Sequence, residues 1–478
     1  GSRVGLEFAQ NQLEQRGLAG AVRPQQADRL AAISVRLELK HDAQEVAHFL
    51  MRCIFTMFAE DVNLLPSGKF TTLIEECLDN PASFAPLLQD LWAKMDEPAY
   101  EKRFYSAFKQ HLMHFNGNLF KDAKAFAMDR EAIGELLAAA KADWTQVDPA
   151  IFGSLLEHAL DEAERSKLGA HYTPRAYVER LVQATIMQPL RQDWGARQQS
   201  IQDAMESGER AAAIALTKQF HQELCSLRIL DPACGTGNFL YVSLELLKGL
   251  EGEVLEMLAR LGESDTIGLG EVDPHQFLGL ELNPRAAAIA ELVVWIGYLQ
   301  QHYRTHSGHP AEPILRAFEN INGGRGKAVD AVLTWDGFPN LAVERVDGQV
   351  QISRPNPRRP VWPQADFIVG NPPFIGGKDI RSELGGDYVE ALWAAHPQMN
   401  DSADFVMYWW DRAAEILTAK NTILRRFGLI TTNSLTMIFN RRVIETHQNG
   451  TPPLSLVFAI PDHPWVDGTD GAAVRIAM

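Results

Sequence analysis

The chain has 478 residues, of which 46% are hydrophobic and 22% charged, and its formal net charge is −16. This is ordinary globular usage in a chain long enough for two or three domains with cores of their own. No stretch approaches the ~20 apolar residues of a membrane span, and no signal peptide opens the chain. The sequence therefore predicts an intracellular protein.

The four cysteines, Cys53, Cys77, Cys225 and Cys234, are scattered without paired spacing. They predict reduced thiols, as in a cytosol, and no zinc site. The opening Gly1-Ser2 is typical of a cleaved tag, so we expect the chain to start inside a longer protein.

Residues 3–150 are predicted to form an all-helical domain, because apolar and charged positions alternate there at helical spacing. Residues 151–225 follow as a connector. Within it, Thr173-Pro174 has the pattern of a helix start, and the polar, alanine-rich residues 196–224 predict a surface helical excursion.

From residue 226 to residue 478, strands alternate with helices. This order predicts an α/β, Rossmann-like domain with a mostly parallel, doubly wound sheet covered by helices on both faces. The loop 323–363 is rich in glycine, proline and charge, and we expect it to carry a short hairpin around Gly348.

The segment from Arg228 to Leu240 predicts a nucleotide-type strand, turn and helix. Gly235 and Gly237 allow a sharp turn and close approach of the backbone to a ligand. The spacing lacks the third glycine of a dinucleotide fingerprint, which argues against NAD. S-adenosylmethionine fits better, because it has no pyrophosphate and carries an α-ammonium that Asp231 is placed to hold. The further cofactor candidates in this segment are Ala233, Asn238 and Phe239.

Glu281 ends a second strand-like run, where an acidic residue is placed to bind both ribose hydroxyls. The interval from the glycine turn exceeds the roughly 20 residues of a dinucleotide fold, so we expect an inserted helix and loop near 250–275. The alternative is a solvated glutamate at a strand end. Asp330 is the candidate for the adenine amine of the cofactor; Asp336 competes for that role, and either residue alternatively caps a turn.

The tetrapeptide Asn371-Pro372-Pro373-Phe374 follows an apolar strand-like run and predicts an amine-methylating site. Two prolines remove two N–H donors and leave backbone carbonyls free to accept hydrogen bonds, together with the Asn371 side-chain oxygen. Two acceptors that hold the hydrogens of an exocyclic amine would localise its lone pair for attack on a methyl group. Phe374 offers a face on which a base stacks. The alternative is a structural loop with a buried phenylalanine.

Taken together, these motifs resemble adenine-N6 DNA methyltransferases in which the cofactor motifs precede Asn-Pro-Pro-Phe. Four further segments strengthen the likeness and make it closest to the MmeI-like methyltransferases of restriction-modification and phage-defence systems. They are Lys167–Pro174, Ala403–Val406 with Trp409-Trp410, Gly428–Ser434, and Phe58–Asp61. The likeness covers most of the chain.

The resemblance implies a class I S-adenosylmethionine-dependent fold and transfer of a methyl group to N6 of a flipped adenine in double-stranded DNA. It also implies that Tyr172 and Thr173 line the cofactor from the side opposite the glycine turn. A prokaryotic cytoplasm is the expected location, and subunits of a defence system are expected partners. Because a target-recognition domain follows at about residue 478 in the family, we expect a chain that is truncated before its main DNA-reading surface.

The net charge of −16 is unusual for a DNA-binding protein, which normally shows a basic footprint. Local arginine clusters do occur on both sides of the catalytic strand. They are Arg354, Arg358 and Arg359 before it, and Arg425, Arg426, Arg441 and Arg442 after it. For any one of these side chains, DNA contact and simple surface solvation are equally compatible with the sequence.

Several other functions are open at this point. No Pro-Cys dipeptide occurs, which excludes a cytosine carbon-5 methylase, and cytosine-N4 enzymes usually carry serine in place of Asn371. A protein-glutamine or ribosomal-RNA methyltransferase also uses Asn-Pro-Pro with an aromatic residue. A fused nuclease is the other alternative; its single trace is Asp28 with Glu38 and Lys40, in surroundings that are predicted to be helical rather than strands.

Overall fold

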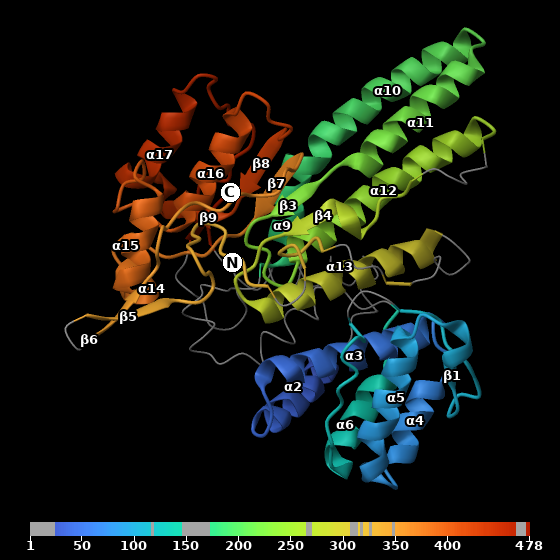
Figure 1. Cartoon of the computed structure of the whole chain (residues 1–478). Helices are drawn as coiled ribbons and strands as arrows, with labels where there is room; N and C mark the ends of the chain where they lie inside the picture. The colour runs from blue at the N-terminus through green and yellow to red at the C-terminus, as the bar shows by residue number, and fades with distance from the viewer. Residues whose placement is uncertain are drawn as a thin grey trace, which may run out of the picture. The chain divides into compact units, whose positions relative to one another are not determined.

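The computed structural model describes residues 24–115, 119–145, 173–263, 270–305, 314–315, 319–324, 327–346, 349–464 and 475–478. Its contacts divide the chain into two compact units, residues 1–160 with 295–318 and residues 161–294 with 319–478. The chain passes from one unit to the other within the long helix α13 (Pro284–Thr305) (Figure 1). The predicted connector helices within 173–225 thus share a unit with the sheet.

The first unit is built from helices, which confirms the prediction of a helical N-terminal region, and it adds one hairpin. The described elements are α2 (Pro24–Glu38), α3 (Ala43–Asp61), α4 (Lys69–Cys77), α5 (Phe84–Asp96), α6 (Arg130–Ala140), β1 (Phe104–Tyr105) and β2 (Gln110–His111). β1 and β2 pair antiparallel. Asp28 and Glu38, the acids of the nuclease alternative, lie on the single helix α2 rather than on adjacent strands.

Aromatic side chains of α3 form the centre of this unit. Phe49 meets Trp92 of α5 edge to face at 5.8 Å, and Phe55 meets Phe115 at 5.7 Å. At the end of α3, the buried Glu60 accepts hydrogen bonds from the Phe70 N–H at 2.5 Å and from the Thr71 hydroxyl at 2.6 Å. The Phe58–Asp61 segment therefore fastens the end of α3 to the first turn of α4, where backbone N–H groups lack helical partners.

The second unit contains a parallel four-stranded sheet in the order β4-β3-β7-β8. Its strands are β3 (Ile229–Asp231), β4 (Phe277–Gly279), β7 (Phe367–Gly370) and β8 (Arg426–Leu429). A parallel bridge from Gly279 to Ile321 extends the sheet beyond β4. All residues of β3 and β7 are buried, as expected of parallel strands covered on both faces. The predicted fold class is confirmed.

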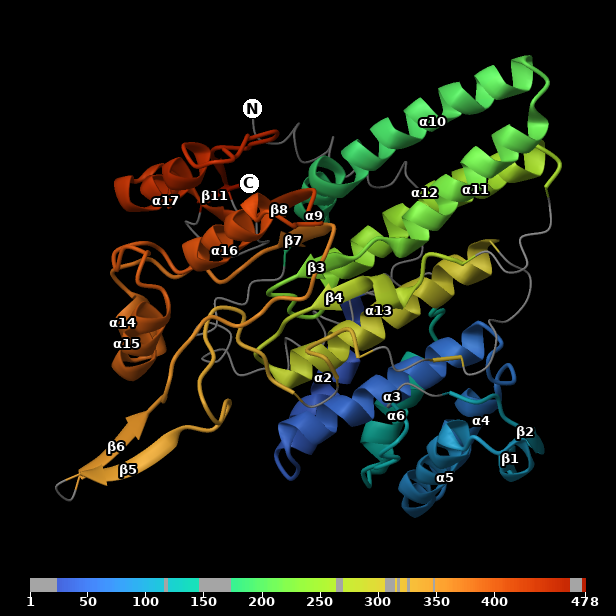
Figure 2. The same cartoon turned by 45° about the horizontal axis from the view of Figure 1, so that its top comes forward.

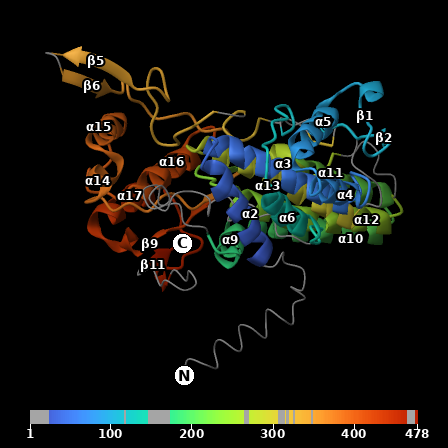
Figure 3. The same ribbon diagram turned by 90° about the horizontal axis from the view of Figure 1, so that it is seen from below.

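The remaining elements of the second unit cover and extend this sheet (Figure 1). The helices are α9 (Arg175–Val182), α10 (Gln188–Glu206), α11 (Arg210–Ser226), α12 (Asn238–Arg260), α14 (Ile380–Leu384), α15 (Gly386–Ala395), α16 (Val406–Thr418) and α17 (Ile438–Gln448). Figure 3 shows α16 beside α17, and the two helices are in contact. A π-helical turn, Gln183–Met187, joins α9 to α10.

Two small antiparallel arrangements complete the unit. Strands β5 (Ala342–Val346) and β6 (Gln349–Ser353) form a hairpin that projects from the body of the unit in Figure 2, where the sequence predicted one. Strands β9 (Thr431–Thr432), β10 (His463–Pro464) and β11 (Arg475–Ala477) form a sheet in the order β10-β11-β9. No described helix is long and apolar enough to cross a bilayer.

A buried polar cluster joins α11 to α12. Glu251 accepts hydrogen bonds from the Val272 N–H at 2.8 Å and from Lys248 at 2.7 Å, and it faces the His221 imidazole at 3.3 Å. Burial of Glu251 opposes its ionisation, but the hydrogen bond from His221 and the charge of Lys248 hold its pKa below the usual value. The carboxylate is therefore charged at neutral pH, and removing it would leave the Lys248 charge with less compensation.

We expect Glu251→Ala to lower the free energy of unfolding by about 3 kcal/mol, because one member of a buried ion pair is removed. The matched control on the same helix is Glu253→Ala, which breaks an exposed pair with Arg191 and is expected to cost about 1 kcal/mol or less. Urea denaturation at pH 7 measures both. Equal losses of unfolding free energy in the two variants would show that the buried cluster does not stabilise the fold more than an exposed ion pair does.

Candidate active site

The candidate site residues gather at the carboxyl edge of the parallel sheet. Asp231 is the last residue of β3, Glu281 lies two residues after β4, and Asn371 directly follows β7. Since these strands are adjacent and parallel, the loops that follow them meet at the same edge, where ligands bind in open α/β sheets. The sequence motifs are thus brought to one place by the fold.

Asp231 is fully buried, with a relative exposure of 0%. One carboxylate oxygen, Oδ1, accepts a hydrogen bond from the Ala233 N–H at 3.0 Å, and the other, Oδ2, is buried without a partner among the described residues. Burial raises the pKa of this carboxyl to about 8, and the charge of Glu281 adds to that rise. A cation that approaches Oδ2 would stabilise the ionised form of this buried carboxyl.

Gly370 makes this arrangement of Asp231 sterically feasible. A Cβ atom on Gly370 would lie 2.6 Å from Asp231 Oδ1, so the end of β7 can approach the carboxylate only without a side chain. This glycine immediately precedes Asn371, and its carbonyl accepts a hydrogen bond from the Ile430 N–H at 3.0 Å. The backbone of Gly370 therefore holds Asn371 close to the carboxylate of Asp231.

The turn after β3 has the backbone conformation that its glycines allow. Gly235 and Gly237 have φ angles of 51° and 86°, in the left-handed region that side chains disfavour. A Cβ atom on Gly237 would also lie 3.0 Å from the Ala290 Cα atom. The Gly235 N–H donates to Glu281 Oε2 at 2.9 Å, so the turn and the acid after β4 form one structure.

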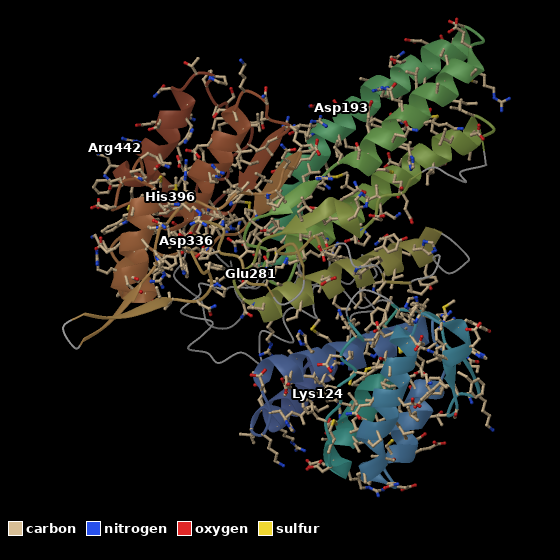
Figure 4. All side chains as sticks on the ribbon, in the orientation of Figure 1. Lys124, Asp193, Glu281, Asp336, His396 and Arg442 are labelled. Carbon is tan, nitrogen blue, oxygen red and sulfur yellow. The ribbon has the colours of Figure 1, made fainter. Side chains whose placement is uncertain are left out.

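Glu281 is held from several sides, which argues against the alternative of a merely solvated strand end. Its Oε1 accepts from the Asn283 N–H at 2.8 Å, and burial raises the pKa of its carboxyl. Its own backbone N–H and carbonyl both bond to the side chain of Asn322 at 2.7 Å. Figure 4 labels Glu281 in the second unit. Sequence analysis missed Asn322, whose only local signal is the turn sequence Asn322-Gly323-Gly324.

Asp330 caps a turn and also reaches across to another element. Its Oδ1 accepts from the Val332 and Leu333 N–H groups at 2.9 and 3.1 Å, and its Oδ2 accepts from the Tyr388 hydroxyl at 2.7 Å. Asp336, the rival candidate, is exposed and pairs with Arg358 at 2.8 Å (Figure 4). Asp330 is thus the buried member of the two, and its contact with the cofactor stays a prediction.

Asn371 is oriented by Thr173. The amide Nδ2 of Asn371 donates to the Thr173 hydroxyl at 2.9 Å, whereas its carbonyl oxygen, Oδ1, is buried and has no partner among the described residues. The Thr173 carbonyl in turn accepts from Asn238 Nδ2 at 2.8 Å. The donor side of the amide is occupied and the acceptor side is left available. Tyr172, expected beside Thr173, lies outside the described residues.

The other predicted residues of the Asn-Pro-Pro-Phe motif lie in the loop after β7, and Phe239 follows the glycine turn after β3. Pro372 is buried, while Pro373 and Phe374 are half-buried. Among the described residues, no donor reaches the Pro372 carbonyl. Phe239 is buried in the first turn of α12, with a relative exposure of 3%. The structure places all of them in the second unit.

Asp404 supports the loop after Asn371, a role that sequence analysis did not assign to it. Its Oδ1 accepts from the Gly377 N–H at 2.9 Å, and its Oδ2 accepts from the Ser434 hydroxyl and from Asn440 Nδ2. A Cβ atom on Gly377 would lie 2.3 Å from the Ser402 carbonyl oxygen, so the loop is pressed onto this segment. Only the folded chain brings these residues together.

Comparison with known proteins gives matches along most of the chain. The family model described as the DNA-methyltransferase domain of MmeI matches residues 203–476, and the one described as the helicase spacer domain of MmeI matches residues 44–120. DNA methyltransferase A of Bacillus subtilis (strain 168) is 24% identical over 400 residues, which are 81% of this chain and 40% of that protein.

A solved structure of the Type IIL restriction-modification enzyme MmeI in complex with DNA superimposes with a TM-score of 0.74 at 23% identity. The superposition covers 96% of this chain and 57% of the solved one. The chain therefore shares this fold along nearly its whole length and spans less than two thirds of each of these two proteins.

Asp231 makes the stability of the fold depend on pH. Its pKa is about 8 in the folded chain and 3.8 in its ordinary state, so the folded state binds more protons between these values. The contribution of Asp231 to the free energy of unfolding is therefore most favourable below about pH 4, and it is lost as the pH rises through about 8. We expect Asp231→Asn, which keeps the acceptor for Ala233, to raise Tm at pH 8 by about 2 °C or more.

Thermal melts at pH 5 and pH 8 test this expectation. The gain in Tm is expected to shrink at pH 5, where the wild-type carboxyl is already neutral in the folded chain. A lower Tm for the variant at both pH values would show that Asp231 is not an electrostatic cost to the fold.

Proposed function

Since the chain belongs to the MmeI DNA-methyltransferase family, we propose that it transfers the methyl group of S-adenosylmethionine to N6 of an adenine in double-stranded DNA. The adenine is flipped out of the duplex to reach the site, at a cost of a few kcal/mol. The proposed setting is a restriction-modification or antiviral defence system in a prokaryotic cytoplasm, with defence-system subunits as further partners.

The residues at the sheet edge fit S-adenosylmethionine. The orphaned Oδ2 atom of Asp231 is a buried acceptor for the α-ammonium group of the cofactor, whose charge would lower the raised pKa of Asp231. Glu281 follows β4 with both oxygens fixed by backbone N–H groups, in the position from which an acid binds ribose hydroxyls. Asp330 would accept from the adenine amine of the cofactor.

The single observation that carries the proposal is the orientation of the Asn371 amide. Its Nδ2 donates to Thr173, so its Oδ1, which has no partner among the described residues, is available to accept a hydrogen bond from the target amine. The Pro372 carbonyl supplies a second acceptor, since no described donor uses it. Two acceptors together draw the N6 lone pair out of conjugation with the adenine ring.

When bound, S-adenosylmethionine supplies an electrophilic methyl group on a positively charged sulfur. The protein's part is to hold the amine and its lone pair in line, with the Asn371 oxygen fixed before the substrate arrives. Phe374 would stack on the flipped base and recover roughly 1–3 kcal/mol of the cost of unstacking. No strong base is required, because the amine loses its proton after it has gained the methyl group.

The family match favours DNA over the protein-glutamine and ribosomal-RNA alternatives, whose amine chemistry would use the same acceptors. The nuclease alternative gains no support, because Asp28 and Glu38 lie on one helix. A nuclease would need such acids on adjacent strands to share a metal ion.

Calorimetric titration of S-adenosylmethionine tests the cofactor site. We expect saturable binding by the chain, a loss of affinity of roughly 10- to 100-fold in Asp231→Ala, and little change in Asn371→Ala. In Asn371→Ala, N6-methyladenine formation on unmethylated DNA is expected to fall by roughly 100-fold or more. Absence of binding by the well-folded chain would contradict the assignment of the cofactor.

Thr173 provides a test of amide orientation. We expect Thr173→Val, which removes the hydroxyl acceptor but keeps the branched shape, to lower the rate of methyl transfer by at least about 10-fold. Thr173→Ser is the matched control and is expected to retain most of the rate. The affinity of both variants for S-adenosylmethionine, measured by calorimetry, separates a loss of amide orientation from a loss of cofactor binding. Equal rates for the valine and serine variants would show that Thr173 does not position Asn371.

A further inference from the structure

Three consecutive large apolar side chains are exposed to solvent in the second unit. Met437, Ile438 and Phe439, which we call the apolar tip, have relative exposures of 66%, 50% and 39%. Met437 directly follows the 3-10 turn Asn433–Thr436, and Ile438 and Phe439 are the first two residues of α17. Single exposed apolar residues are normal on a protein surface, but a contiguous group marks a surface that meets a partner.

The apolar tip is held on a rigid base. The next residue, Asn440, is buried at 3% exposure, accepts from the Asp404 N–H at 2.9 Å, and donates to the Ser434 carbonyl at 3.0 Å. One turn further, Val443 packs in a small apolar cluster with Ala403, Val406 and Met407. One face of α17 is therefore fixed against α16 (Figure 3), while the side chains of the tip remain exposed.

The same base is joined to the catalytic loop through Asp404. This carboxylate accepts from Gly377 of the loop with one oxygen, and from Ser434 and Asn440 beside the tip with the other. The loop follows β7 and the tip follows β8, which are neighbouring parallel strands. Whatever binds at Asn371 therefore has the apolar tip at a fixed place on the same edge of the sheet.

The charges near this edge favour an anionic partner. Most arginines of the clusters around the catalytic strand are engaged within the fold: Arg358 pairs with Asp336, Arg359 with Glu415, Arg425 with Asp193 and Arg441 with Glu445. Arg442, beside the tip, makes no ion pair among the described residues and lies 5.9 Å from the Phe439 ring (Figure 4).

Lys378, directly after Gly377, is exposed and also makes no ion pair among the described residues. Two cations without an ion pair among the described residues thus lie on the elements that Asp404 joins, Lys378 in the loop after β7 and Arg442 on α17, in a chain whose net charge is −16. The negative chain as a whole repels a polyanion such as DNA. Attraction is therefore expected mainly where cations such as Arg442 and Lys378 make no ion pair among the described residues.

We propose that the apolar tip inserts into the base stack of duplex DNA where the target adenine has left it, with Arg442 and Lys378 on the flanking phosphates. The inference rests on the proposed function and adds the surface that stabilises the flipped state. Apolar side chains wedge between base steps in other DNA-binding proteins, and the vacancy left by a flipped base offers them an unstacked apolar face. The cations add sequence-independent affinity that salt weakens.

The test compares two fluorescein-labelled duplexes of the same sequence, one intact and one with a single abasic position that mimics the vacancy. Fluorescence anisotropy at fixed salt gives Kd for the chain on each duplex. We expect roughly 10-fold tighter binding to the abasic duplex, from contact of the tip with the exposed neighbouring bases. The double substitution Ile438→Ser with Phe439→Ser is expected to abolish this preference and to leave binding to the intact duplex nearly unchanged.

Two further variants separate the tip from general effects. Val35→Ser with Leu39→Ser changes two exposed apolar residues of the first unit, at 57% and 80% exposure, and is expected to keep the preference. Arg442→Gln is expected to weaken binding to both duplexes alike and to reduce the salt slope by about 1. Calorimetry with S-adenosylmethionine checks that each variant is folded.

A chain that shows no preference for the abasic duplex, or no DNA binding, overturns the inference. It is also overturned if the tip variant keeps the preference, or if it instead abolishes self-association of the chain measured by light scattering. If the proposed function is wrong, the wild-type protein is expected not to bind S-adenosylmethionine. The anisotropy assay needs no cofactor, so the two outcomes are measured independently.

Discussion

The close approach of β3 and β7 at their carboxyl ends is the constraint on which the site depends. Asp231 ends one strand and Gly370 the other, and the absence of a side chain on Gly370 lets the backbone reach the carboxylate. Asn371 then leaves β7 beside the cofactor turn, where Thr173 fixes its amide. A side chain at position 370 would push β7 away from the buried carboxylate of Asp231.

Burial gives this site an electrostatic character that suits a cation. Asp231, Glu281 and Asp330 all have pKa values raised by burial; the charge of Glu281 adds to the rise for Asp231, and the charge of Asp330 adds to the rise for Glu281. In the free protein these acids are costly to ionise, which is a common cost at functional sites. A positively charged ligand removes part of that cost, so the same burial that destabilises the free fold strengthens binding.

Unlike these buried acids, several arginines around β7 and β8 are neutralised by ion pairs within the chain. Arg359 and Arg425 form ion pairs with Glu415 and Asp193, and so contribute little to a basic surface. What matters for an anionic partner is the small number of unpaired cations near the site, such as Arg442, rather than the net charge.

The sequence by itself determined the kind of fold and the main motif residues. Asp231, Gly235, Gly237, Glu281 and Asn371 are recognisable because strand ends, glycine turns and Asn-Pro-Pro are local patterns in a few consecutive residues. The helical N-terminal region and the hairpin near residue 348 were also predictable from local composition and turn residues.

Only the tertiary structure decided which residues orient these motifs. Asn322 holds Glu281 from 41 residues away, Thr173 holds Asn371 from 198 residues away, and Asp404 joins the loop after Asn371 to α17. Single Asn, Thr and Asp residues carry no local signal of their partners. Their roles arise from strand order and close packing, because a hydrogen bond forms between groups that the whole fold brings within about 3 Å.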